Sequence, residues 1–276
     1  MNSSSSGILP ADAASAPADR GGGSGREMRR EPYRWRFSGS FIAHLFKATV
    51  QQHHRDLAPT IGRFVPPAAV VFDIGAHAGQ YTKLFARAAS RGRVYAFEPG
   101  SYARAILRAV VAVRRLANVA VMPMALGGTC GVATLSMPIK RGGSFGFGLS
   151  HLGRPHDRWS AVAQELVGLA TLDAVAAALD LDRLDLIKAD IEGSELALLR
   201  GGEQTLRRFR PILVIELVGA HLARADNRVE DAFAFLAGLG YTAFDLTAAG
   251  ELVPAPGPRD GEFWCFYGGD PQPAIG

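Results

Sequence analysis

The feature that most limits the possible folds is a series of short apolar runs that alternate with helical patterns from Val70 onward. The run VVFDIG at 70–75 precedes helical spacing over 81–90, and RVYAFEP at 93–99 precedes a helix over 101–116. Strands that alternate with helices form a parallel sheet with right-handed crossovers. The fold class is therefore predicted to be α/β with helices on both faces. Further strands are predicted at 118–126, 185–193, 211–218, 241–247 and 262–268, and further helices at 194–209 and 227–239.

The chain is expected to divide into a tail, a helical segment and one domain. Residues 1–28 are rich in Ser, Ala, Gly and Pro without apolar periodicity, which is typical of a disordered tail, and they lack the pattern of a secretory signal. Residues 29–68 hold a basic aromatic stretch and a helix over 41–58, which we expect to pack on the core. The domain is expected over 69–270, with a lid-like insertion near 128–169 whose centre, 141–159, mixes glycines, aromatics and histidines.

Composition excludes several classes of protein. The 276 residues carry a net charge of only +4, which is weak evidence for nucleic-acid binding, and none is expected. No apolar run approaches the ~18 residues of a membrane span. Two cysteines, Cys130 and Cys265, cannot make a disulfide framework or a zinc site by themselves. We therefore expect a reducing, cytoplasmic location.

In a parallel sheet, ligands bind beyond the carboxyl ends of the strands. Asp73 ends the first strand, and Gly75 and Gly79 follow in a GxxxG turn, unlike the GxGxxG of dinucleotide binders. Glu98 ends the second strand, where a carboxylate can accept hydrogen bonds from both hydroxyls of a ribose. Ala125 and Leu126 end the third strand and could flank an adenine ring. These strand ends indicate a nucleoside ligand with an ammonium and a carboxylate.

Acidic residues follow the next two strands. In a strand, Asp190 and Glu192 would share a face with Lys188, and crowded charges shift each other's pKa values, which can create a proton acceptor. Asp190 is the first candidate for a general base, followed by Glu216 and His221. No metal ligand is assigned, although Asp190 and Glu216 could instead hold Mg²⁺.

The motifs DIGAHAGQYT, AFEP, NVAVMPMALG, DLIKADIEGSELALLRGG and PILVIE resemble, in this order, the FkbM-type S-adenosylmethionine-dependent methyltransferases. The resemblance implies a class I methyltransferase fold, a Rossmann-like sheet of seven mostly parallel strands closed by a C-terminal hairpin. It also implies that S-adenosylmethionine is the cofactor. The residues that it implies as cofactor contacts are Asp73, Gly75, Ala76, Gly79, Tyr81, Glu98, Ala125, Leu126 and Glu192.

The resemblance further implies transfer of a methyl group to a hydroxyl of a small molecule, a sugar, a polyketide or a lipid-linked glycan. Two alternatives stay open. One is a nicotinamide-dependent oxidoreductase on a similar sheet. The other is a non-catalytic module that binds RNA or an anionic membrane through the basic aromatic segment 33–46. The sequence leaves the oligomeric state undetermined.

Overall fold

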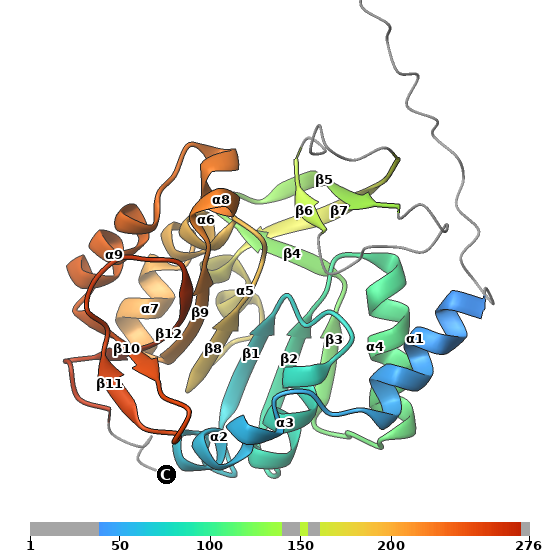
Figure 1. The fold of residues 1–276 in the computed structure, drawn as a ribbon, viewed down its shortest axis with the longest axis horizontal. Helices are drawn as coiled ribbons and strands as arrows, with labels where there is room; N and C mark the ends of the chain where they lie inside the picture. Colours follow the sequence, from blue (N-terminus) through green and yellow to red (C-terminus); the bar gives the residue numbers. More distant parts are fainter. Residues whose placement is uncertain (1–38, 140–149, 154–160, 272–276) are drawn as a thin grey trace, which may run out of the picture.

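A computed structural model describes residues 39–139, 150–153 and 161–271. Within these residues the chain forms an eight-stranded sheet and a smaller, four-stranded sheet (Figure 1). The larger sheet holds β1 (Val70–Ile74), β2 (Arg93–Phe97), β3 (Val119–Met122), β8 (Leu186–Ala189), β9 (Ile212–Leu217), β10 (Tyr241–Leu246), β11 (Leu252–Pro254) and β12 (Gly261–Tyr267). The smaller sheet holds β4 (Met124–Gly127), β5 (Gly131–Pro138), β6 (His151–Leu152) and β7 (Val162–Thr171). The helices are α1 (Gly39–Val50), η1 (Arg55–Leu57), α2 (Ala58–Phe64), α3 (Gln80–Ala88), α4 (Ser101–Val113), α5 (Leu172–Ala178), α6 (Glu195–Arg200), α7 (Glu203–Phe209), α8 (Gly219–Leu222), η3 (Ala223–Ala225) and α9 (Val229–Gly238).

The larger sheet confirms the predicted α/β class and its mostly parallel strands. Its order is β11-β10-β12-β9-β8-β1-β2-β3, and the five strands from β9 to β3 are parallel. Strand β12 is antiparallel to both β9 and β10, as the predicted C-terminal hairpin requires. The expected number of seven strands is wrong by one, because β11 pairs with the outer edge of β10.

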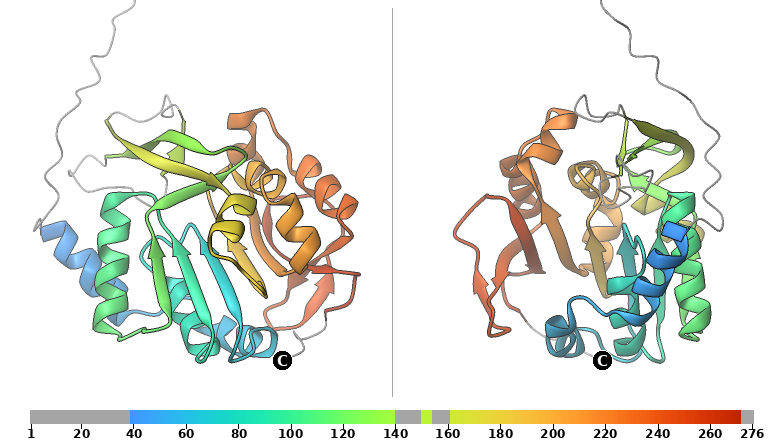
Figure 2. Two further views of the ribbon diagram at one scale, coloured as in Figure 1. Left: turned by 180° about the vertical axis from the view of Figure 1, so that it is seen from behind. Right: turned by 45° about the vertical axis from the view of Figure 1, so that its right-hand side comes forward.

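Helices cover both faces of this sheet (Figure 2). On one face, α2 and α3 bury Phe64 and Phe85 against Val71 and Val94 of the strands, and α4 buries Leu107 beside them. On the other face, α5, α6, α7 and α9 pack against strand residues such as Phe72. Side chains alternate between the faces of a strand, so these apolar runs are buried on both sides.

The strand predicted over 118–126 is two strands in different sheets. Pro123 lies between β3 and β4, where its missing N–H and fixed φ favour the end of a strand. Strand β3 completes the larger sheet, whereas β4 pairs in parallel with β7. In its described residues, the insertion expected near 128–169 is therefore largely a sheet, which lies beyond the carboxyl ends of β1 and β2 (Figure 1).

Two predicted helices are also divided. The helix over 194–209 is interrupted by Gly201 and Gly202, and a Cβ atom on Gly201 would lie 2.2 Å from the carbonyl oxygen of Gly127. The helix over 41–58 ends at Val50. The tail at 1–28 and most of the segment 141–159 lie outside the described residues. No helix in the described part of the chain has both the length and the apolar character needed to cross a membrane.

Candidate active site

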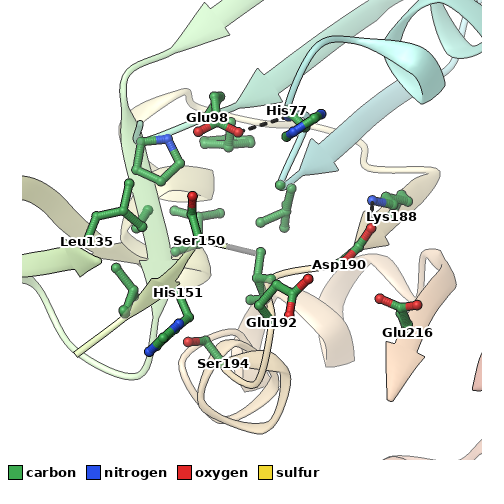
Figure 3. Close-up of a pocket in the computed structure, with 18 of the residues that line it drawn as sticks. His77, Glu98, Leu135, Ser150, His151, Lys188, Asp190, Glu192, Ser194 and Glu216 are labelled. Atoms are coloured by element: carbon green, nitrogen blue, oxygen red, sulfur yellow. Dashed lines mark hydrogen bonds and ion pairs between the residues drawn. The ribbon is translucent and has the colours of Figure 1, made fainter. Parts of the chain in front are cut away.

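A cavity of about 390 Å³ opens at the carboxyl ends of β1, β2, β8 and β9, beneath the smaller sheet. Its size falls in the range of small-molecule sites, which span roughly 300–1,000 Å³. Eight of the residues predicted from the sequence contribute to its wall: Gly75, Tyr81, Glu98, Ala125, Leu126, Asp190, Glu192 and Glu216. Glu98 lies on one side of the cavity, and the other acidic side chains lie across from it (Figure 3).

Gly75 joins the two sides of the cavity through backbone contact. Its φ of 79° lies in the left-handed region, and a Cβ atom would lie 2.0 Å from the carbonyl oxygen of Asp190. The amides of Gly75 and Ala76 both donate to the carbonyl of Phe97, at 3.1 and 2.9 Å. The turn after β1 is therefore fixed against the ends of both β2 and β8.

Asp73, Ala76 and Gly79 were predicted to contact the cofactor, but they lie behind the cavity wall. Asp73 is fully buried, and its Oδ2 accepts a 2.5 Å hydrogen bond from the Thr82 hydroxyl. Burial raises the pKa of Asp73 above its ordinary value. Gly79 has φ 83° at the start of α3, where a Cβ atom would lie 2.7 Å from Leu107 Cδ1. These residues shape the turn from behind the cavity wall.

Glu98 is held by the backbone of two turns. Its Oε2 accepts the amide of His77 at 2.9 Å, and its Oε1 accepts the amide of Gly100 at 2.8 Å. His77 has a left-handed φ of 50°, which aims its amide at the carboxylate. Burial raises the pKa of Glu98 to about 7, although both amides favour its charged form. Each carboxylate oxygen keeps a lone pair for a ligand hydroxyl.

The wall between the two acidic sides is apolar. Ala125 and Leu126 of β4 are buried, and Leu135 of β5 faces them across the cavity edge. Phe97 at the end of β2 adds an aromatic side chain to the same wall. Such a surface suits a flat, uncharged ring.

Lys188 and Asp190 form an ion pair opposite Glu98. Lys188 Nζ lies 3.1 Å from Asp190 Oδ2, and Lys188 is only 3% exposed. Burial disfavours its charge, but the carboxylates of Asp190 and Asp73 outweigh burial and raise the pKa of Lys188. Burial likewise opposes the ionisation of Asp190, but the Lys188 ammonium and a hydrogen bond with Glu216 hold its pKa below the ordinary value.

Glu216 at the end of β9 shares a hydrogen bond with Asp190. Burial first, and then this hydrogen bond and the charge of Asp190, raise the pKa of Glu216 to about 8. When two carboxyl groups are in contact, their pKa values commonly diverge in this way, so that one group is ionised and the other protonated.

Glu192 lies beside His221, with 3.0 Å between its Oε2 and His221 Nδ1. Burial, followed by the charge of Asp190, raises the pKa of Glu192 to about 7, while burial lowers that of His221. The prediction that Glu192 shares a strand face with Lys188 is wrong, because β8 ends at Ala189. Glu192 instead occupies a left-handed turn (φ 55°), which Glu195 stabilises by accepting the amides of Ile191 and Gly193.

Sequence reasoning missed several residues of the cavity wall. His54 stacks on Tyr81 with ring centroids 4.9 Å apart, and the Tyr81 hydroxyl donates to Glu262 at 2.8 Å. Lys188 Nζ lies 5.0 Å from the centre of the same ring. His77 and His151 also line the cavity. His77 could have been found within the glycine turn, whereas no local pattern marks His54 or His151.

The acidic side of the cavity does not fit Mg²⁺. Asp190 already pairs with the Lys188 ammonium and with a Glu216 carboxyl that holds a proton, so a second cation there would meet a positive charge. In the described ranges, no group of three or more His, Cys, Asp or Glu side chains has a metal-binding arrangement. We therefore derive no step through a metal.

Comparison with protein families assigns the chain that forms this cavity to a family. The model of the methyltransferase FkbM domain matches residues 73–243, more than half of the chain. The chain belongs to the FkbM methyltransferase family. The match runs from the β1 turn through both sides of the cavity, and it confirms the resemblance in the motifs. Membership in the FkbM family supports the interpretation of the chain as a methyltransferase.

Solved structures similar to this FkbM-family chain are distant in sequence. Methyltransferase FkbM from Methylobacillus flagellatus KT is 16% identical, with a TM-score of 0.47 over 82% of this chain and 58% of that one. This chain thus spans less than two thirds of that protein. A candidate methyltransferase from Streptococcus mutans, in complex with SAH, is 10% identical (TM-score 0.43, 75% and 92% covered). An rRNA methylase from Streptococcus thermophilus is 11% identical, with a TM-score of 0.43 over 78% of this chain and 95% of that one. No curated protein sequence matches the chain.

Proposed function

We propose that this FkbM-family chain is an S-adenosylmethionine-dependent O-methyltransferase that acts on a small molecule, a sugar or a lipid-linked acceptor. The observation that carries the proposal is the division of one cavity into a fixed carboxylate, an apolar wall and a proton-sharing acidic side. The first two features suit a nucleoside, and the third suits removal of a proton from an alcohol. The free thiols Cys130 and Cys265 agree with a cytoplasmic location for this activity.

The residues present fit the cofactor that the family implies. Glu98 would accept the ribose hydroxyls, and Ala125 with Leu126 would contact the adenine ring. The turn at Gly75 and the ring of Tyr81 would border the methionine part, supported from behind by Asp73, Ala76 and Gly79. When bound there, S-adenosylmethionine supplies an electrophilic methyl group.

Glu192 is the residue best suited to accept the proton of the acceptor hydroxyl. Its pKa of about 7 lies near the working pH, where a general base is most effective. His221 Nδ1 lies 3.0 Å from Glu192 Oε2, and Oε2 has no hydrogen bond, so a small rotation of either side chain would let the two share the proton. We propose that His221 supports the base in this way from outside the cavity wall.

Asp190, the first candidate for the base from sequence, is better suited to another role. Lys188 holds the pKa of Asp190 low, so its carboxylate is a weak base, and its negative charge helps to raise the pKa values of Glu192 and Glu216. Full turnover of Asp190→Asn, with an unchanged dependence on pH, would contradict this role.

Binding of S-adenosylhomocysteine, measured by calorimetry on the full chain, tests the proposal. We expect micromolar affinity for the wild type and a loss of about 10²-fold in Glu98→Ala, because a charged acceptor of two hydroxyls is removed. Glu165→Ala is the matched control, since Glu165 accepts the neighbouring amide of Ser101 at 3.0 Å but does not line the cavity. If folded wild-type protein failed to bind, or if both variants bound equally, the proposed site would be wrong.

A further inference from the structure

Helix α1 carries an apolar stripe on its outer side. Ile42, Phe46 and Val50 follow at intervals of four residues and are 57%, 68% and 51% exposed. This spacing places them on one side of a helix. The opposite side packs on the domain, where Phe41 meets the Tyr102 ring of α4 at 5.6 Å and Ala48 is buried. Helix α1 is thus apolar on both sides, but the described residues cover only one of them.

The part of the chain around α1 is strongly basic. Residues 39–139 hold 11 Lys and Arg against 3 Asp and Glu, whereas residues 161–271 hold 9 against 18. Among the three acids of the first part, only Asp56 is exposed, because Asp73 and Glu98 are buried. The modest net charge of the whole chain therefore conceals a positive half, with a net charge of +8 in 39–139, and a negative half.

Basic side chains lie next to the apolar stripe and at the C-terminal end of α1. Lys47 follows Phe46 and is exposed, and Arg114, which is also exposed, donates to the carbonyl of Thr49 beside Val50. Lys83 is buried and donates its Nζ to the carbonyls of Ala48 and Gln51, both at 2.8 Å, so it holds the end of α1 in place. Burial, followed by the positive charges of Arg114, Arg87 and Arg55, lowers the pKa of Lys83 to about 8. The helices α1, α3 and α4 contain no acidic residue at all. Figure 1 shows α1 as the outermost element beyond α4.

We propose that the outer side of α1, together with the exposed basic side chains of Lys47, Arg87 and Arg114 near it, docks on the surface of an anionic phospholipid bilayer. An exposed apolar stripe beside cationic side chains is the pattern of helices that lie in a membrane interface. RNA would use the cations and could stack a base on Phe46, but it would leave the aliphatic side chains of Ile42 and Val50 without a role, because they offer neither a charge to phosphate nor a ring to a base. The docking surface stands on these residues alone and does not depend on the proposed methyl transfer.

The docking surface leads along the chain to the cavity. Helix α1 ends at Val50, and four residues later His54 lines the cavity and stacks on Tyr81. His53 and Gln52 fasten this connection by hydrogen bonds to Gln80 at the start of α3. One short segment of the chain therefore connects the proposed docking helix α1 to the cavity wall.

Vesicle flotation with the full chain tests the docking surface. We expect the wild type to float with vesicles of phosphatidylcholine that contain one third phosphatidylglycerol, and to stay behind with phosphatidylcholine alone. In the double variant Ile42→Ser, Phe46→Ser the partition coefficient should fall at least about tenfold, because the apolar contact is lost. In Lys47→Gln, Arg87→Gln, binding should weaken several-fold and become less sensitive to salt.

The matched control is Val132→Ser, Leu166→Ser. Val132 and Leu166 are 78% and 77% exposed on the smaller sheet, so this variant removes similar apolar surface from a different place and should float like the wild type. Thermal unfolding of every variant verifies that the fold is intact. The proposal is overturned if the wild type does not float with anionic vesicles, or if the α1 variant floats to the same extent as the control. Tight binding of single-stranded RNA that the α1 variant retains, without flotation, would assign the basic surface to nucleic acid instead.

Discussion

The two sides of the cavity hold buried carboxylates in different ways. Glu98 is fixed by two backbone amides, from His77 and Gly100, so its position is set by the turns after β1 and β2. Asp190, Glu216 and Glu192 are instead held by other side chains, namely by one another, by Lys188 and by His221. Backbone amides do not ionise near neutral pH, whereas these side chains can gain or lose a proton there. The first arrangement suits steady binding of a ligand, and the second suits the movement of a proton.

The largest effect should follow from removal of the cation that holds the acidic side together. In Lys188→Met, the buried carboxylates of Asp73 and Asp190 lose their partner, and we expect the free energy of unfolding at pH 7 to fall by about 3–5 kcal/mol. Without Lys188 the pKa of Asp73, which burial already raises, rises further, and the pKa of Asp190 loses the charge that holds it low, so both lie above the values of the unfolded chain. The penalty is therefore greatest at neutral pH and shrinks as the pH falls toward about 4.

Urea denaturation at pH 7 and pH 4 measures this effect. Arg183→Gln is the control, because the ion pair of Arg183 with Asp185 is partly exposed and should contribute at most about 1 kcal/mol. A Lys188→Met protein that lost equal stability at both values of pH would show that packing, rather than charge, holds the acidic side.

A smaller effect, on turnover alone, should distinguish proton transfer from ligand binding. We expect Glu192→Gln to lower kcat by about 10²–10³-fold while the affinity for S-adenosylhomocysteine changes by less than about threefold. Because Glu192 must be ionised to accept a proton, wild-type kcat should rise with pH through about 7, and this rise should vanish in the variant. An equal loss in affinity and in kcat would mean that Glu192 contacts the cofactor, as the family resemblance implies, and is not the base.

The smallest effect should come from a slight displacement on the fixed side. In Gly100→Ala the added Cβ would lie 3.0 Å from Glu98 Oε1 and 3.2 Å from Leu135 Cδ2. We expect Glu98 to shift and the affinity for S-adenosylhomocysteine to fall about three- to tenfold, less than in Glu98→Ala. Gly168→Ala, whose Cβ would have 4.0 Å of space to Met124, should bind normally in the same calorimetric titration. Unchanged affinity in Gly100→Ala would mean that the ligand does not depend on the position of Glu98.

Strands and their end residues could be predicted because their signals are local. Buried runs such as VVFDIG and PILVIELV stand out in the sequence, and the carboxyl edge of a parallel sheet then brings Glu98, Asp190 and Glu216 to one cavity. Two local signals were not used. The Gly201–Gly202 pair could have predicted the break in the helix over 194–209, and Thr171, whose side chain accepts the amide of Ala174, could have predicted the start of α5.

The rest depends on contacts between distant parts of the chain. Helix α1 ends where Lys83 and Arg114, more than 30 residues away, bind its last carbonyls. The roles proposed for Asp190 and Glu192 depend on their pKa shifts. Burial and nearby charges such as Lys188 produce these shifts, and they cannot be predicted from the positions of acidic residues in the sequence. Asp73 illustrates the same limit, since its place in the motif did not reveal that its side chain points to Thr82 behind the cavity.

The parallel pairing of β4 with β7 has a consequence for how this fold can diversify. Gly127 and Thr171 are register partners, so the excursion between them leaves and rejoins the domain at neighbouring positions. Everything that this excursion contributes to the cavity, including Leu135 and His151, can be lengthened, shortened or exchanged as a unit. Glu98 directly follows β2, Asp190 and Glu192 follow β8, and Glu216 lies in β9, so the larger sheet keeps these residues in place during such an exchange. Evolution or a protein engineer can therefore replace one wall of the cavity without rebuilding the acidic walls.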